Sequence, residues 1–192
     1  MIKKSLFFLN IFFTYFFFIS IASADLQTRL INKLTATKTI SFDFNQKISD
    51  KEETGNCYIK YPLLMKCNYQ NIKQKTIISN SKTVAIIKKK YKKIYLYPIK
   101  ATPLFFILKK EKIINLIRQN KPTKISSNMI EFEFIDQKTN KVKIFFDKNS
   151  LDFKGWETID SYSNYVSFEI KNLKTNIQIV DSFFKIPQEK DL

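Results

Sequence analysis

Apolar and polar residues alternate along most of this chain, and this period of two constrains the fold more than any other feature. In the first such stretch Ile40, Phe42 and Phe44 alternate with polar residues. Alternation puts large apolar side chains on one face of a strand and polar ones on the other. The same pattern predicts strands at 57–61, 65–69, 76–79, 83–88, 91–99, 129–135, 142–147, 151–160, 165–171 and 177–186, the last with a break inside. We therefore expect an antiparallel sheet with one apolar face.

Two segments depart from this period and predict helices. Residues 25–34 carry an apolar stripe at helical spacing, typical of a short amphipathic helix. Thr102 and Pro103 suit a helix start, and the five large apolar residues 104–108 follow at once. A helix that is apolar around most of its circumference must be covered on several sides, so this one is either deeply buried or closes over something apolar. Residues 113–117 add a more ordinary amphipathic turn.

The first 24 residues are typical of an export signal that is removed. A cationic start precedes an apolar run at 6–21, and the small residues 22–24 fit a signal-peptidase site. A retained membrane anchor is the alternative, because the run approaches the roughly 18–20 residues that span a bilayer. With no cysteine near the cut we expect no lipid on the new N-terminus, and in a double-membraned bacterium the product lies in the periplasm. The expected division is a signal peptide at 1–24 and one domain at 25–192.

The chain is strongly basic, with a formal net charge of +16. Only Arg29 and Arg118 among its 33 basic residues are arginines. Base reading and bidentate phosphate recognition favour arginine, and an exported protein does not meet nucleic acid, so we expect no such partner. Codon usage in an AT-rich genome explains the lysines, and attraction to anionic lipid is the alternative. The cluster at 88–93 has two corresponding interpretations: lysines that guard a strand junction, or a surface for an anionic partner.

Histidine is absent, which removes the commonest general base and metal ligand. No Ser or Cys stands beside a plausible base either, so we predict no catalytic residue, no metal site and no cofactor. If 57–61 and 65–69 form a hairpin, Cys57 and Cys67 face each other on its apolar face. Both a disulfide and two free thiols that act as small apolar residues fit this placement.

Several short motifs follow one another along the chain. They are Phe44-Asn45-Gln46, Gly55 before a strand that runs into Pro62, the turn Ser79-Asn80-Ser81-Lys82-Thr83, Tyr97-Pro98 at a strand end, Thr102-Pro103-Leu104, and Phe184-Lys185-Ile186-Pro187. In this order and spacing, residues 25–192 resemble the periplasmic outer-membrane lipoprotein carriers (LolA) nearly end to end.

The resemblance implies an α+β, mostly β fold: a single strongly curved antiparallel sheet, an incomplete barrel, with helices that cap an apolar cavity. It implies a monomeric, non-catalytic periplasmic chaperone without a cofactor. Such a protein binds the acyl chains of acylated lipoproteins at an inner-membrane ABC-type release complex and carries them to an outer-membrane lipoprotein receptor. A periplasmic adaptor module of the same fold, which senses lipid or protein, is the alternative.

The resemblance also locates the lipid between the sheet and the helices. We expect the lipid-binding side chains to be Ile40, Phe42, Phe44, Ile59, Tyr61, Met65 and Tyr69 on the sheet, with Leu104, Phe105, Ile107 and Leu108 on the helices. Trp156 fits a cavity or a core equally well. Periodicity alone favours a sealed core, and only the resemblance favours a lidded cavity.

Two positions depart from the family's pattern. Tyr61 stands where the family typically has an Arg that holds the lid helices through hydrogen bonds to backbone carbonyls. A tyrosine has one hydroxyl donor instead of five guanidinium donors. Three consequences are open: closure of the lid is weaker, the lid is held by packing instead, or release of the cargo is tuned differently. Cys67 stands where Trp is common.

Overall fold

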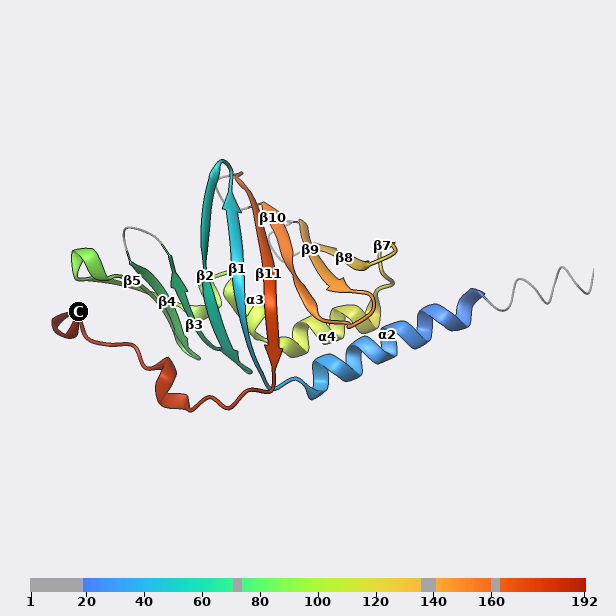
Figure 1. Ribbon diagram of the computed structural model, residues 1–192, viewed down its shortest axis with the longest axis horizontal. Helices are drawn as coiled ribbons and strands as arrows, with labels where there is room; N and C mark the ends of the chain where they lie inside the picture. Colours follow the sequence, from blue (N-terminus) through green and yellow to red (C-terminus); the bar gives the residue numbers. More distant parts are fainter. Residues whose placement is uncertain (1–18, 71–73, 136–140, 160–162) are drawn as a thin grey trace, which may run out of the picture.

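The computed structural model describes residues 19–70, 74–135, 141–159 and 163–192 (Figure 1). The helices are α2 (Ile19–Ala36), α3 (Leu104–Leu108) and α4 (Lys110–Gln119), with short 3-10 helices η1 (Lys89–Tyr91), η2 (Ile99–Ala101), η3 (Asp181–Phe184) and η4 (Glu189–Asp191). The strands are β1 (Thr39–Ile48), β2 (Lys51–Lys60), β3 (Leu64–Tyr69), β4 (Lys75–Asn80), β5 (Thr83–Lys88), β6 (Lys93–Pro98), β7 (Lys124–Ile125), β8 (Met129–Ile135), β9 (Lys141–Asp147), β10 (Phe153–Ile159) and β11 (Tyr165–Thr175).

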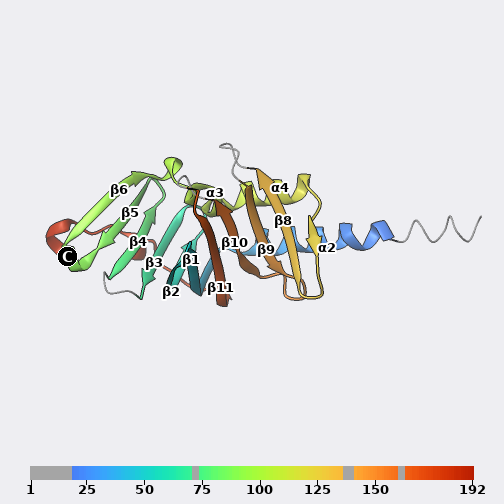
Figure 2. The same ribbon diagram turned by 90° about the horizontal axis from the view of Figure 1, so that it is seen from above.

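All the described strands belong to one sheet, and neighbouring strands are antiparallel. The strand order is β6-β5-β4-β3-β2-β1-β11-β10-β9-β8-β7, with β6 and β7 at the two edges. The sheet curves around the helices without closing (Figures 1 and 2). The expected α+β, mostly β architecture with an incomplete barrel is therefore confirmed.

One face of the sheet, here called the inner face, packs against the helices. The alternating residues Phe42 and Phe44 of β1 are buried on it, as is Phe168 of β11. Leu30 of α2 and Ile117 of α4 belong to the same apolar cluster and are 0% exposed. The period of two thus buries one side of the central strands, and the helices cover that side, whereas the edge strands β6 and β7 have no buried residue.

Gly55 of β2 allows a close approach on this face. A Cβ atom built on Gly55 would lie 2.1 Å from the backbone oxygen of Asn68 and 2.7 Å from Cζ of Phe44. The Phe44 ring therefore lies against bare backbone, and its other contacts include the Tyr69 ring at 4.9 Å. A side chain at position 55 would displace this ring.

The C-terminal segment covers part of the opposite, outer face, and here the prediction was wrong. β11 continues to Thr175, and the predicted strand at 177–186 is instead an irregular segment that contains η3. Phe183 packs on Tyr58 of β2 with ring centroids 5.1 Å apart, and Phe184 is 1% exposed. The apolar residues of this segment therefore pack on the outer face of the sheet and do not pair with it as a strand.

Other boundaries also differ from the predictions. The first helix begins at Ile19, ahead of the predicted residue 25. The predicted strand at 91–99 is divided into η1, a left-handed residue at Lys92 and β6. No helix among the described residues is long and apolar enough to cross a membrane. The apolar run at 6–21 lies largely outside those residues, so the cleavage after residue 24 stays a prediction.

Candidate functional site

Ten of the eleven predicted lipid-binding residues lie in or against one apolar cluster on the inner face, and the eleventh, Ile107, is buried outside that cluster. Of the eleven, seven are at most 5% exposed, and the other four are half-buried. The buried ones are Ile40, Phe42, Phe44, Ile59, Met65, Ile107 and Leu108, and the half-buried ones are Tyr61, Tyr69, Leu104 and Phe105. Their proximity is what the alternation predicted. Their contact with lipid stays a prediction.

An aromatic row crosses the inner face from β3 to β10, with rings contributed by four of the five strands it spans, and sequence reasoning only partly found it. The rings of Trp156 and Phe168 stack with centroids 4.1 Å apart, and Phe168 stacks on Phe44 at 4.8 Å. Phe153 extends the row on one side and Tyr69 on the other. Alternation alone would place Phe153 and Trp156 on opposite faces, because they are three residues apart, and they share this face because the β9–β10 register shifts between Phe153 and Gly155. Trp156 therefore belongs with the apolar cluster.

A pocket of about 30 Å³ lies near the C-terminal end of α2, lined among others by Leu34, Tyr61, Lys110, Phe146 and Phe153. That volume holds one or two water molecules, whereas ligand pockets span roughly 300–1,000 Å³. An acyl chain does not fit into this pocket. Binding an acyl chain at this position therefore requires the residues that line the pocket to move.

Lys110 joins the two longer helices at this pocket. Its Nζ donates hydrogen bonds to the carbonyl of Thr35 at 3.1 Å and to that of Thr37 at 2.6 Å. The ammonium also lies 5.4 Å from the ring centroid of Tyr61. Lys110 is only 8% exposed, and burial lowers its pKa, with a smaller opposing effect from Glu111. A cation thus binds the carbonyl end of α2, where the helix dipole favours positive charge.

Sequence reasoning missed Lys110, because nothing distinguishes it from the many other lysines before the fold is known. It begins α4, directly after the short apolar helix α3. Its hydrogen bonds reach back 73 and 75 residues along the chain. Lys110 therefore joins α4 to the carbonyl end of α2 across a long separation in the sequence.

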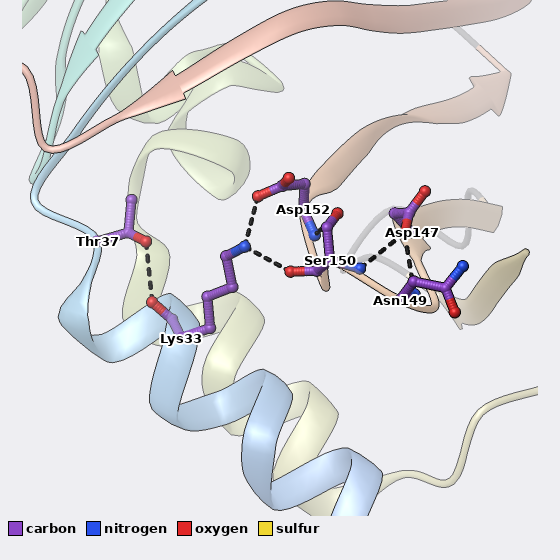
Figure 3. A network of polar contacts seen from close by, with 6 residues as sticks. All are labelled: Lys33, Thr37, Asp147, Asn149, Ser150 and Asp152. Atoms are coloured by element: carbon purple, nitrogen blue, oxygen red, sulfur yellow. Dashed lines mark hydrogen bonds and ion pairs between the residues drawn. The ribbon is translucent and has the colours of Figure 1, made fainter.

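Further polar contacts fix α2 to the sheet. Lys33 forms an ion pair with Asp152 at 2.6 Å and also donates to the carbonyl of Ser150 (Figure 3). Asp147 organises that turn, since its Oδ1 accepts hydrogen bonds from the backbone N–H groups of Asn149 at 2.9 Å and Ser150 at 2.8 Å. These bonds lower the pKa of the Asp147 carboxyl, with the bond from Ser150 as the largest cause. α2 is therefore held on its sheet side by charged contacts.

α3 packs on the core mainly through apolar side chains, whereas α4 is also joined to α2 by hydrogen bonds, among them those of Lys110. The Leu63 N–H donates to the Leu108 carbonyl at 3.2 Å, and Gln27 of α2 donates to the carbonyls of Ile117 and Asn120. Beneath them the apolar side chains of α3 lie on the core. These two helices cover part of the inner face, and we call them the lid.

Cys57 and Cys67 oppose each other in the β2–β3 register, and the structure joins them in a disulfide. The two side chains are 1% and 4% exposed and belong to the inner-face cluster. In the described parts of the chain, no group of three or more His, Cys, Asp or Glu side chains lies close enough together to hold a metal ion.

Comparisons with known proteins agree with this architecture. The family model described as "Outer membrane lipoprotein carrier protein LolA" matches residues 35–187. No curated protein sequence matches the chain. An uncharacterized conserved protein from Thermus thermophilus has a similar structure, with a TM-score of 0.54, 8% identity, and coverage of 86% of this chain and 94% of that one.

Two further solved structures are more distant. A LolA superfamily protein from Nitrosomonas europaea gives a TM-score of 0.45 at 7% identity and covers 83% of this chain and 97% of that one. MucB, solved in complex with MucA(peri), gives 0.48 at 9% identity and covers 87% of this chain and 60% of that one.

Proposed function

This chain belongs to the LolA family of outer membrane lipoprotein carrier proteins, and we propose that it binds the acyl chains of lipoproteins beneath its lid and carries them across the periplasm. The observation that carries the proposal is the lid itself. All five residues of α3, Leu104–Leu108, are apolar, and α3 is joined to the rest of the protein mainly by packing on the aromatic inner face. A permanent core helix and a movable cover both bury such residues, and the family match favours the movable cover.

In the proposed cycle, the free energy gained by burying an acyl chain offsets the free energy needed to open the lid. Each methylene moved out of water contributes about 0.8 kcal/mol, so ten methylenes contribute about 8 kcal/mol. That amount exceeds the few kcal/mol by which a closed conformation is commonly favoured over an open one. The lipid can therefore replace side-chain contacts on the inner face, and the closed packing keeps the empty protein from exposing a large apolar surface.

The proposed setting follows from the family and from the first 24 residues. We place the mature protein, beginning at Asp25, in the periplasm. Its proposed partners are an inner-membrane ABC-type release complex, which loads it, and an outer-membrane lipoprotein receptor, which unloads it. An intact mass of periplasmic material that still includes residues 1–24 would contradict this placement.

Native mass spectrometry of the protein, purified from the periplasm of cells that make lipoproteins, tests the proposal directly. We expect a one-to-one complex with an acylated lipoprotein that is lost in Phe105→Glu, a change at a half-buried lid position. Lys109→Glu changes an exposed neighbour and serves as the control. If Phe105→Glu folds normally and still carries lipoprotein, the binding site is elsewhere. If it unfolds, α3 is part of a sealed core and the lid assignment is wrong.

A further inference from the structure

The β5–β6 end of the sheet carries a surface that the acyl-binding site does not use. β5 and β6 lie at one end of the molecule, away from α2 and α4 (Figures 1 and 2). Around their connection five of the six residues 88–93 are lysines, and three exposed tyrosines accompany them. We call this the lysine–tyrosine surface. It consists of Lys88, Lys89, Lys90, Tyr91, Lys92, Lys93, Tyr95 and Tyr97.

The register places part of this surface on the inner face of the sheet. Tyr97 pairs with Val84, and Tyr95 pairs with Ile86. Val84 belongs to the inner-face cluster, so its strand neighbours two residues apart point to the same side. Tyr95 and Tyr97 therefore continue the inner face beyond the helices. They are 44% and 43% exposed.

Lysine side chains lie next to these tyrosine rings. Lys88 Nζ lies 5.0 Å from the ring centroid of Tyr95, and Lys93 pairs with Lys88 in the same row. Lys89 and Lys90 are exposed in η1, next to Tyr91, which is 53% exposed. Aromatic rings flanked by ammonium groups are thus presented together at the end of the molecule.

Carboxylates balance little of this charge. Residues 54–110 contain 13 lysines and no acidic residue. The C-terminal η4 supplies the acidic groups near this edge, where Glu189 Oε1 accepts a hydrogen bond from the Ile94 N–H at 2.9 Å. That contact blocks part of the β6 edge and leaves the tyrosine-bearing side open.

We propose that the lysine–tyrosine surface binds the anionic surface of a lipid bilayer. Clustered lysines are attracted to anionic headgroups, each contributing a roughly fivefold gain in binding. Tyrosine is enriched where proteins meet the headgroup layer, since its ring is apolar and its hydroxyl polar. Lysines alone would suffice to guard a sheet edge, and the exposed tyrosines beside them favour the bilayer. This inference does not depend on acyl-chain carriage.

Vesicle co-sedimentation of the mature protein, with no acylated cargo present, tests the inference. The vesicles contain phosphatidylcholine alone, or equal parts phosphatidylcholine and phosphatidylglycerol. We expect binding only to the anionic vesicles, weakening as salt is added. Replacing Lys89, Lys90, Lys92 and Lys93 with Gln should weaken it at least tenfold, and Tyr95→Ser with Tyr97→Ser should weaken it at unchanged net charge.

A matched control replaces four exposed lysines elsewhere, Lys121, Lys124, Lys154 and Lys174, with Gln, giving the same change in net charge. An equal loss in this control would show that net charge rather than the lysine–tyrosine surface binds. Absence of binding to anionic vesicles would also overturn the proposal. Capture on poly-glutamate without vesicle binding would overturn it in favour of an acidic protein partner. Circular dichroism checks that each variant is folded.

Discussion

Replacing Lys110 with Met should open the lid and tighten lipid binding. The change keeps an unbranched side chain and removes the hydrogen bonds to Thr35 and Thr37. A hydrogen bond to a charged group contributes about 1.5–3 kcal/mol. The exposed Thr35 carbonyl turns to water when released, and the cost of burying the ammonium disappears. We therefore expect a net loss of about 2 kcal/mol in the closed state, equivalent to a factor of about 30 in population.

That factor has a measurable consequence for affinity. When the binding-competent state is rare, the apparent dissociation constant is the intrinsic one divided by the competent fraction. A diacylated fluorescent peptide should then bind Lys110→Met up to about 30-fold more tightly, while urea denaturation shows the loss of about 2 kcal/mol. Lys121→Met, at an exposed position, should change neither. Lost stability with unchanged affinity would show that lid opening does not limit binding.

Tyr61 supplies a companion test of the same contact. An Arg at this position, as the family typically has, would stand beside the Lys110 ammonium, which lies 5.4 Å from the Tyr61 ring centroid. Like charges at that distance repel. Tyr61→Arg alone should therefore lower the melting temperature, and adding Lys110→Met should restore it. A higher melting temperature in the single variant would contradict the inferred role of the Lys110 hydrogen bonds in holding α4 to α2.

Three further predictions follow from other contacts. Gly55→Ala should cost at least about 2 kcal/mol in urea denaturation, because its Cβ would lie 2.1 Å from the Asn68 oxygen; a neutral result would show that this strand pair adjusts freely. Burial raises the pKa of Tyr61, with Glu111 adding to it, so its stabilisation is complete below about pH 10 and is lost as the pH rises further; Tyr61→Phe should flatten that decline in urea denaturation, and an equal decline in the variant would contradict this. Protein from the periplasm should contain no free thiol, since Cys57 and Cys67 form a disulfide; full alkylation without reductant would show otherwise.

The elements that sequence predicted well are those whose burial is one-sided and whose partners are close in the chain. Phe42 and Phe44 alternate with polar neighbours, and the β2–β3 hairpin pairs Cys57 with Cys67 as the alternation implies. In such strands the local sequence determines both which face is buried and how neighbouring strands pair. The five apolar residues of α3 likewise signalled a helix that must be covered.

The errors arose where tertiary contacts decide. The spacing around Phe184 imitates a strand, but the segment packs over a sheet face that no local pattern reveals. The start of α2 carries no distinguishing signal, because the residues before Asp25 are compatible with a helix. The role of Lys110 depends on carbonyls 73 and 75 residues away. Residue type and spacing cannot encode such a contact in a lysine-rich chain.

The most direct test of acyl-chain binding on the inner face uses Trp156, the single tryptophan of the chain. Its ring stacks on Phe168 within the aromatic row, with centroids 4.1 Å apart. A diacylated peptide with bromine atoms on its acyl chains should quench Trp156 fluorescence in a saturable, one-to-one titration. The same peptide without bromine should bind equally and quench far less. Saturable binding by calorimetry, with no difference between the two peptides in quenching, would place the acyl chains away from the inner face and contradict the proposed function.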